Sequence, residues 1–406
     1  MADGGSEGEA GRRFPALHHS NFRRYVVGQG VSLVGFWMQS VAQGWLVYSV
    51  SGSEFWLGAV AFVGYLPVLC LSPVAGAIVD RVDKYRLILS TQAAAMVLAF
   101  ALAALAWAGL ATVPTVAVLA ALLGTVGAFD LPARQAFLVD LVGAEDLPSA
   151  IALNATIFNT ARVIGPAVAG LLVGSAGETS CFLVNGVSYL AALWALWGME
   201  LPPPASRRAA GGDRSLRSGL AYVRGQRATR SLLVALGLVS AFSLQANILM
   251  PALAKRTFAA DATGYGLLLT AYGAGAVSSA LLLARRGRSG RERRRVLLAG
   301  LVVFGCGLLG LAASADYATA LLCQLVAGFG MVRFTATTNA SVQLQVEDAY
   351  RGRVMGLHTV MFAGMAPLGS LVLGALATPY GPRPALVLSG LVPLLVAWWL
   401  QATTLA

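Results

Sequence analysis

The apolar residues of this chain gather into stretches of about 20 residues, and no other feature of the sequence limits its fold as strongly. A helix of that length spans the hydrocarbon core of a bilayer, which is about 30 Å thick. Hydrophobic residues make up 57% of the 406 residues and charged residues only 12%, against about 25% charged in soluble domains. Only helices and closed barrels satisfy every backbone group in lipid, and the stretches lack two-residue alternation, so we predict transmembrane helices.

Twelve such stretches predict an all-α membrane protein with twelve transmembrane helices. The predicted spans are 23–50, 56–79, 87–108, 113–132, 150–175, 179–199, 231–254, 264–284, 296–314, 317–338, 354–377 and 383–401. We divide the chain into an N-terminal tail (1–22), a six-helix bundle (23–199), a basic linker (200–230) and a second six-helix bundle (231–406). Within the linker, 215–230 mixes apolar and basic positions at helical spacing. It is either a helix lying on the membrane surface or a plain solvated linker.

The basic residues predict the orientation. With the N-terminus inside, 24 of the 29 basic residues fall in cytoplasmic segments, three fall in external loops, and Arg162 and Arg333 lie within spans. Cytoplasmic loops of membrane proteins carry such an excess of Lys and Arg. We therefore expect a multi-pass protein of the plasma (cytoplasmic) membrane with both termini in the cytoplasm. Lipid headgroups, and not nucleic acid, are the expected acidic partner for the net charge of +11.

The two halves look related at an offset of about 200 residues. Gly165-Pro166 in span 5 corresponds to Ala366-Pro367 in span 11, and Asp130 corresponds to Arg333. Transporters built from such repeats bind substrate between the halves near the midplane of the membrane. We expect Asp130 and Arg333 to be either a gate pair on one side of that site or two residues that each cap their own surroundings.

A charged segment follows span 2 and predicts a conformational latch. A glycine allows close helix approach, and a carboxylate at a helix end can hold a basic residue or cap a neighbouring helix. The alternative is a loop that only sets topology. We expect Asp80→Asn to cripple turnover while leaving membrane insertion intact. The latch residues are Gly76, Asp80, Arg81, Asp83, Lys84 and Arg86.

This segment resembles the signature loop of the major facilitator superfamily, G-x-x-x-D-[RK]-x-G-[RK]-[RK]. Gly76, Asp80, Arg81 and Lys84 match it, and Asp83 stands where the second glycine is usual. The resemblance extends over nearly the whole chain and is closest to the branch of enterobactin exporters and macrolide efflux pumps, as in the stretch FDLPARQAFL after span 4. It implies two pseudo-symmetric six-helix bundles.

Span 5 resembles the antiporter motif of the superfamily, G-P-x-x-G-G. Gly165, Pro166 and Gly170 match it, with Ala169 in place of the first glycine of the last pair. The resemblance implies export by exchange. Arg162 lies about 13 residues into the span, near the midplane, where an unpaired charge costs several kcal/mol. It is expected to bind an anionic substrate group or to form a structural ion pair.

Polar side chains in spans 1 and 7 are candidates to line a substrate cavity. The alternative is that they make helix-packing hydrogen bonds of modest strength. No acid lies in span 1, so proton coupling rests on the family resemblance. The candidates are Ser32, Gln39, Gln43, Gln245 and Asn247.

Several other function classes are excluded by missing motifs. The only lysines, Lys84 and Lys255, do not follow glycine, so no phosphate-binding loop of an ATPase is present. No zinc-protease or serine-nucleophile motif occurs. We therefore expect no enzyme activity, no cofactor and no metal. The interpretation is a monomeric secondary exporter of small amphipathic or hydrophobic molecules, with protons as the counter-ion. Drug efflux and siderophore export both fit, and the alternatives are an uncoupled facilitator and a receptor or scaffold with a transporter fold.

Overall fold

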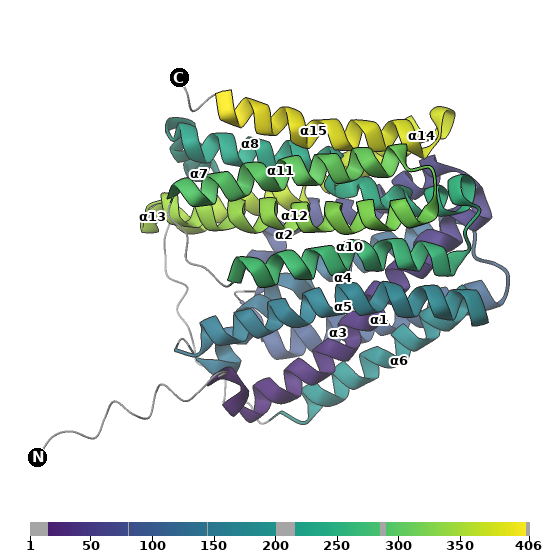
Figure 1. Ribbon diagram of the computed structural model, residues 1–406. Helices are drawn as coiled ribbons and strands as arrows, with labels where there is room; N and C mark the ends of the chain where they lie inside the picture. Colours follow the sequence, from purple (N-terminus) through teal and green to yellow (C-terminus); the bar gives the residue numbers. More distant parts are fainter. Residues whose placement is uncertain (1–14, 80, 144, 200–215, 285–289, 403–406) are drawn as a thin grey trace, which may run out of the picture.

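The computed structural model describes residues 15–79, 81–143, 145–199, 216–284 and 290–402, and every regular element among them is a helix. Figure 1 shows long helices running along a common direction in one bundle. The helices are η1 (Pro15–His18), α1 (Ser20–Ser51), α2 (Glu54–Val79), α3 (Lys84–Trp107), α4 (Val113–Val142), α5 (Leu147–Ala176), α6 (Glu178–Trp197), α7 (Leu216–Gly225), α8 (Arg227–Phe242), η2 (Leu244–Leu249), α9 (Met250–Ala252), η3 (Leu253–Thr257), α10 (Ala262–Ala284), α11 (Gly290–Ala313), α12 (Tyr317–Gln345), α13 (Asp348–Ala363), α14 (Ala366–Tyr380) and α15 (Pro382–Ala402).

Twelve long helical segments form the bundle, as predicted. Among the described residues, eleven segments are both long and apolar enough to cross a membrane. The twelfth is α1, which is longer, at 32 residues, and less apolar. It packs on α5 and α6. Its polar content is explained by this burial, since Gln39 of α1 accepts a hydrogen bond from Asn185 of α6 at 2.6 Å.

The two halves repeat one packing scheme. Helix α2 packs on α4, as α10 packs on α12. Helix α3 packs on α4 and α6, as α11 packs on α12 and α15. The prediction of two pseudo-symmetric six-helix bundles is therefore confirmed, and Figure 1 shows them as neighbouring layers of helices.

Successive helices turn back at two ends of the bundle. We call the end that carries the α2–α3 and α4–α5 connections and α7 the basic end, after its many arginines. The other end is the opposite end. Four turns there use a glycine with a left-handed backbone, at φ values of 63° to 82°. Only glycine adopts that region without steric cost. These glycines are Gly52, Gly109, Gly177 and Gly381.

Two spans of the second half are broken, although the sequence predicts continuous helices over 231–254 and 354–377. Span 7 is built from α8, η2, α9 and η3, and span 11 from α13 and α14 with a break at Gly364 and Met365. Pro367 lies in the first turn of α14, where its missing N–H costs nothing. By contrast, α5 continues through Pro166 without interruption. Helices α4 and α12 also run further than predicted, to Val142 and Gln345.

The predicted linker helix is shorter than 215–230. It ends at Gly225, and 227–230 already belong to α8. Helix α7 packs on α13, where the rings of Tyr222 and Tyr350 stack with centroids 4.3 Å apart. The solvated-linker alternative is therefore wrong for α7, and 200–215 lie outside the described residues.

Candidate functional site

Helices α5 and α10 form the first of two seams that join the halves toward the opposite end. The seam is a contact of glycine on glycine. A Cβ added at Gly266 would lie 2.6 Å from the Pro166 carbonyl oxygen and 2.7 Å from Gly170 Cα, so no larger residue fits. Thr263 Oγ1 donates a hydrogen bond to the Gly170 carbonyl at 3.1 Å. The two motif residues Pro166 and Gly170 therefore serve close helix packing here.

Helices α2 and α14 form the second seam in the same way. A Cβ added at Gly374 would lie 2.9 Å from Gly58 Cα and 2.7 Å from the Glu54 carbonyl oxygen. A Cβ added at Gly58 would contact the Ser370 carbonyl oxygen, just as one added at Gly266 would contact the Pro166 carbonyl oxygen. Gly58 in the second seam takes the place that Gly266 has in the first, and Gly374 takes the place of Gly170. Each of these two correspondences is an offset of about 200 residues, so the two seams are related by the internal repeat.

Charged and aromatic side chains reinforce this closure at the opposite end. Arg256 Nη1 lies 3.2 Å from Glu54 Oε1, and the Glu54 side chain is only 3% exposed. Trp45 of α1 stacks on Tyr265 of α10, and Lys255 Nζ lies 5.7 Å from the centroid of the Trp45 ring. Sequence reasoning missed these residues. Their only signal is that Lys255 and Arg256 are two of the three basic residues assigned to external loops.

The latch segment at the basic end makes its ion pairs inside the first half. Lys84 Nζ lies 2.7 Å from Asp140 Oδ2 of α4, which ties the start of α3 to the end of α4. Asp83 caps α3 by accepting hydrogen bonds from the backbone N–H groups of Tyr85 and Arg86 at 2.9 and 3.3 Å. This cap explains why an aspartate can replace the usual glycine of the signature.

Of the remaining latch residues, the structure describes Gly76 and Arg81. Asp80 lies outside the described residues. Arg81 is exposed, and no described residue lies within 4 Å of a Cβ built at Gly76. Helix α13, which continues α14 toward the basic end, packs on α7, α8 and α12 of its own half. The glycine-tight seams therefore belong to the opposite end, and the latch segment is not drawn into them.

Arg162 lies where the α5–α10 seam ends, in the middle of the bundle. Its guanidinium carbon lies 5.5 Å from the centroid of the Trp37 ring of α1 and 5.4 Å from that of Tyr272 of α10. Its charge also acts on the phenol of Tyr65 of α2. We call Trp37, Tyr65, Arg162 and Tyr272 the arginine box. Gly165, the first glycine of the antiporter-like motif, packs against Trp37 and lets α5 approach α1 closely.

Asp130 and Arg333 are not brought together. Asp130 accepts hydrogen bonds from Thr91 and Gln92 of α3 at 2.7 and 3.2 Å, and Arg134 Nε lies 2.5 Å from its other oxygen. The Arg333 guanidinium lies over the ring of Phe329, at 4.6 Å from the centroid. Each residue thus serves its own half in this conformation, which is the alternative interpretation of the pair.

The five cavity candidates divide into two groups. Ser32 and Gln39 are buried, with Gln39 bonded to Asn185, and Asn247 accepts a long 3.5 Å hydrogen bond from Gln324. These three serve packing. Gln43 and Gln245 are half-buried, and neither side chain makes a hydrogen bond within the described part of the chain. They remain candidates to contact a substrate.

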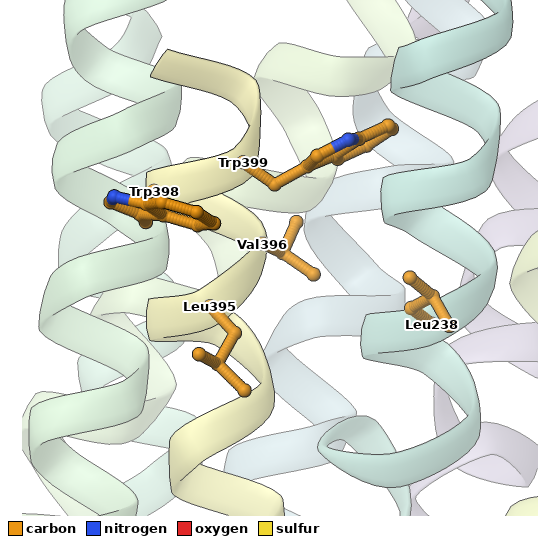
Figure 2. Close-up of a pocket in the computed structure, with 5 residues that line it drawn as sticks. All are labelled: Leu238, Leu395, Val396, Trp398 and Trp399. Carbon is orange, nitrogen blue, oxygen red and sulfur yellow. The ribbon is translucent and has the colours of Figure 1, made fainter. Parts of the chain in front are cut away.

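Two surface cavities lie away from these residues. One, of about 260 Å³, is an apolar groove between α8 and α15 lined by Leu238, Leu395, Val396, Trp398 and Trp399 (Figure 2). Trp398 is 70% exposed, so acyl chains would contact this groove in a bilayer. The other, of about 290 Å³, lies at the basic end between Gln343 of α12 and Arg351 of α13. Neither cavity contains a residue of the arginine box.

Comparison with known proteins agrees with this architecture. The Staphyloferrin A transporter of Staphylococcus aureus is 26% identical, covering 86% of this chain and 87% of its own. The multidrug efflux pump Tap of Mycolicibacterium fortuitum is 26% identical, covering 87% of each chain. The crystal structure of a bacterial homolog of the human lysosomal transporter Spinster, inward-facing and unoccupied, covers 95% of this chain and 96% of that chain at a TM-score of 0.74 and 11% identity.

The profile of the family described as transmembrane secretion effector matches residues 12–405, almost the whole chain. The resemblance found in the sequence to exporters of the major facilitator superfamily is thereby confirmed. The chain is a multi-pass membrane transporter of the efflux type, and it belongs to the transmembrane secretion effector family of the major facilitator superfamily.

Proposed function

We propose that this transporter exports small amphipathic or hydrophobic organic molecules from the cell by alternating access, in exchange for protons. The observation that carries the proposal is the pair of repeat-related glycine seams. They close the bundle at the opposite end, whereas α13 at the basic end packs on its own half. A transporter that alternates access needs one closed end and one open end in each state.

The orientation follows from the excess of basic residues, which places the basic end and both termini in the cytoplasm. The described conformation is then the inward-facing one, closed to the outside. Substrate enters from the cytoplasm or from the inner leaflet and leaves when the seams part. The name of one relative, the multidrug efflux pump Tap, supports this direction.

The coupling ion is a separate part of the proposal. Among the acids in the described spans, Asp130 lies nearest to the middle, and both of its oxygens are engaged by Arg134, Thr91 and Gln92. Both oxygens are thus occupied by partners within the first half. This observation favours a second candidate function, an uncoupled facilitator. Proton exchange would require Asp130 to exchange Arg134 for a proton during the cycle.

The test uses purified protein in liposomes with an imposed pH gradient. Lumenal pH is recorded while a panel of drugs and catecholate siderophores is added, and efflux of each compound is followed in parallel. We expect substrate-dependent proton movement, which Asp130→Asn abolishes. Efflux without proton movement would establish the facilitator. Absence of both, with the protein folded, would contradict export of these compounds.

A further inference from the structure

The arginine box holds a positive charge that the described residues do not neutralise. Arg162 lies near the middle of α5, and no described carboxylate lies within 4 Å of its guanidinium. A charge at that depth costs several kcal/mol unless it has a partner or water. The two aromatic rings supply part of the compensation through cation–π contacts. The Tyr272 hydroxyl can accept one hydrogen bond, which leaves most of the five N–H groups of the guanidinium without an acceptor.

The box offers few acceptors: the Tyr272 hydroxyl is hydrogen-bonded to Arg162, and the Tyr65 hydroxyl can donate or accept. Trp37 Nε1 is buried and has no hydrogen-bond partner among the described residues. The hydroxyl of Tyr65 can also donate. Phe36, Tyr65 and Phe158, which lie beside or within the box, are each exposed at between 39% and 48%. Protein therefore does not seal the box, and its open side is bordered by aromatic rings.

The charge is absent from the related seam. The glycine contacts relate Gly170 to Gly374 and Pro166 to Ser370, an offset of 204 residues, which places Ala366 at the position of Arg162. The pairing of Pro166 with Pro367 that the sequence predicts, at an offset of 201, is therefore wrong by three residues. Ala366 is the buried first residue of α14. The α2–α14 seam therefore forms without a cation at this position, whereas the α5–α10 side carries one.

We infer that the arginine box binds the carboxylate of an amphipathic organic anion whose aromatic or alkyl body lies against the surrounding rings. Arg162 pairs with both oxygens, as a planar guanidinium does. The Trp37 N–H is the second donor. This inference rests on the proposed function and names its substrate class, which is organic acids rather than cationic drugs.

The test measures binding without any gradient, using two probes of the same shape. The full-length protein in nanodiscs is titrated with 2-naphthoate and with its neutral counterpart 2-naphthamide, and empty nanodiscs correct for partition into lipid. We expect naphthoate to bind about tenfold tighter than naphthamide, which corresponds to about 1.4 kcal/mol. Arg162→Gln should remove this preference by weakening naphthoate about tenfold while leaving naphthamide unchanged.

Matched variants separate binding from structure. Arg333→Gln removes another cation that lies over an aromatic ring and should leave the preference intact. Arg162→Lys should keep part of it. Trp37→Phe preserves an aromatic ring but removes the N–H, and should weaken naphthoate a few-fold with naphthamide unchanged. The last two variants also decide the matter if Arg162→Gln does not fold.

Three results would overturn the inference: equal affinity of the wild type for both probes, binding of neither probe, or an equal loss of both in Arg162→Gln. The same protein assayed in liposomes distinguishes this failure from that of the proposed function. Efflux of a cationic drug without naphthoate binding refutes only the substrate class. Naphthoate binding without any efflux supports the box and refutes export.

Discussion

The two seams between the halves share their closure but not their charge. Both the α5–α10 and the α2–α14 seam place glycine against glycine, at positions related by the internal repeat. Only the α5–α10 seam continues into the arginine box, and only the α2–α14 seam ends at a broken helix. The glycine contacts occur in both copies, so we relate them to the packing of the two halves against each other. The arginine box occurs in one copy only, and the substrate site that we propose lies there.

The largest effect is expected from adding one methyl group to each seam, which tests whether the two seams are equivalent. Gly266→Ala and Gly374→Ala each place a Cβ within 2.7 Å of a carbonyl oxygen across the seam. Overpacking costs about 1–3 kcal/mol, enough to shift an opening equilibrium about fivefold to 150-fold. We expect both variants to reduce transport and to speed labelling of a cysteine placed at Gln43 by an impermeant maleimide added at the opposite end. The labelling uses a chain whose four native cysteines are replaced by alanine.

Gly127→Ala is the matched control for these two variants. Gly127 lies in α4, and no described residue lies within 4 Å of its added Cβ. Its labelling rate should equal that of the parent. If only one of the two seam variants opened the end, the seams would not be equivalent, and the comparison would fail.

A smaller effect is expected at the Glu54–Arg256 ion pair beside the α2–α14 seam, where replacing each partner should lower stability by a different amount. The Glu54 side chain is 3% exposed and the Arg256 side chain 53% exposed. Arg256→Ala leaves a buried carboxylate unpaired and should cost about 1–3 kcal/mol. Glu54→Gln leaves a solvated arginine and should cost less than about 1 kcal/mol. Thermal unfolding of both variants and of the double variant gives the coupling. Equal losses in the two single variants would mean that burial does not govern this pair.

The smallest effect is expected at the Lys84–Asp140 pair, which lies within one half. Both side chains are partly exposed, at 23% and 33%, so Lys84→Ala should lower stability by about 1 kcal/mol or less. Because the pair does not cross between the halves, labelling at the opposite end should not change. A change in that labelling would show that the latch segment communicates with the seams.

The number of long helical segments could be predicted because bilayer thickness sets how many apolar stretches can span it. The ends of α4 and α12 could not, because both helices continue past the apolar stretch, to Val142 and Gln345. The breaks in spans 7 and 11 could not. Pro166 lies inside a continuous helix and Pro367 begins a new one, so a proline in the middle of a span does not decide between the two outcomes. What decides is whether neighbouring helices hold the backbone in line, and the sequence does not state the neighbours.

The sequence places Asp130 and Arg333 near the ends of their spans, but both lie near the middle of the longer helices α4 and α12, and their partners could not be predicted either. The rise per residue gives the level of Arg162 and the similar levels of Asp130 and Arg333. It does not reveal that Asp130 accepts a hydrogen bond from α3, or that the Arg333 guanidinium lies over the ring of Phe329. The seam glycines are four among 46 in the chain, and only their contacts distinguish them. The repeat offset is the one sequence signal that relates the two pairs.

The break between α13 and α14 divides span 11 into two helices, whereas α5, the corresponding span of the first half, is one continuous helix. We expect a displacement of α13 at the basic end to be taken up at Gly364 and Met365 before it reaches the seam formed by α14. Helix α7 should move with α13, because Tyr222 is stacked on Tyr350. Helix α5 has no such break, so we expect a displacement at one of its ends to reach the other.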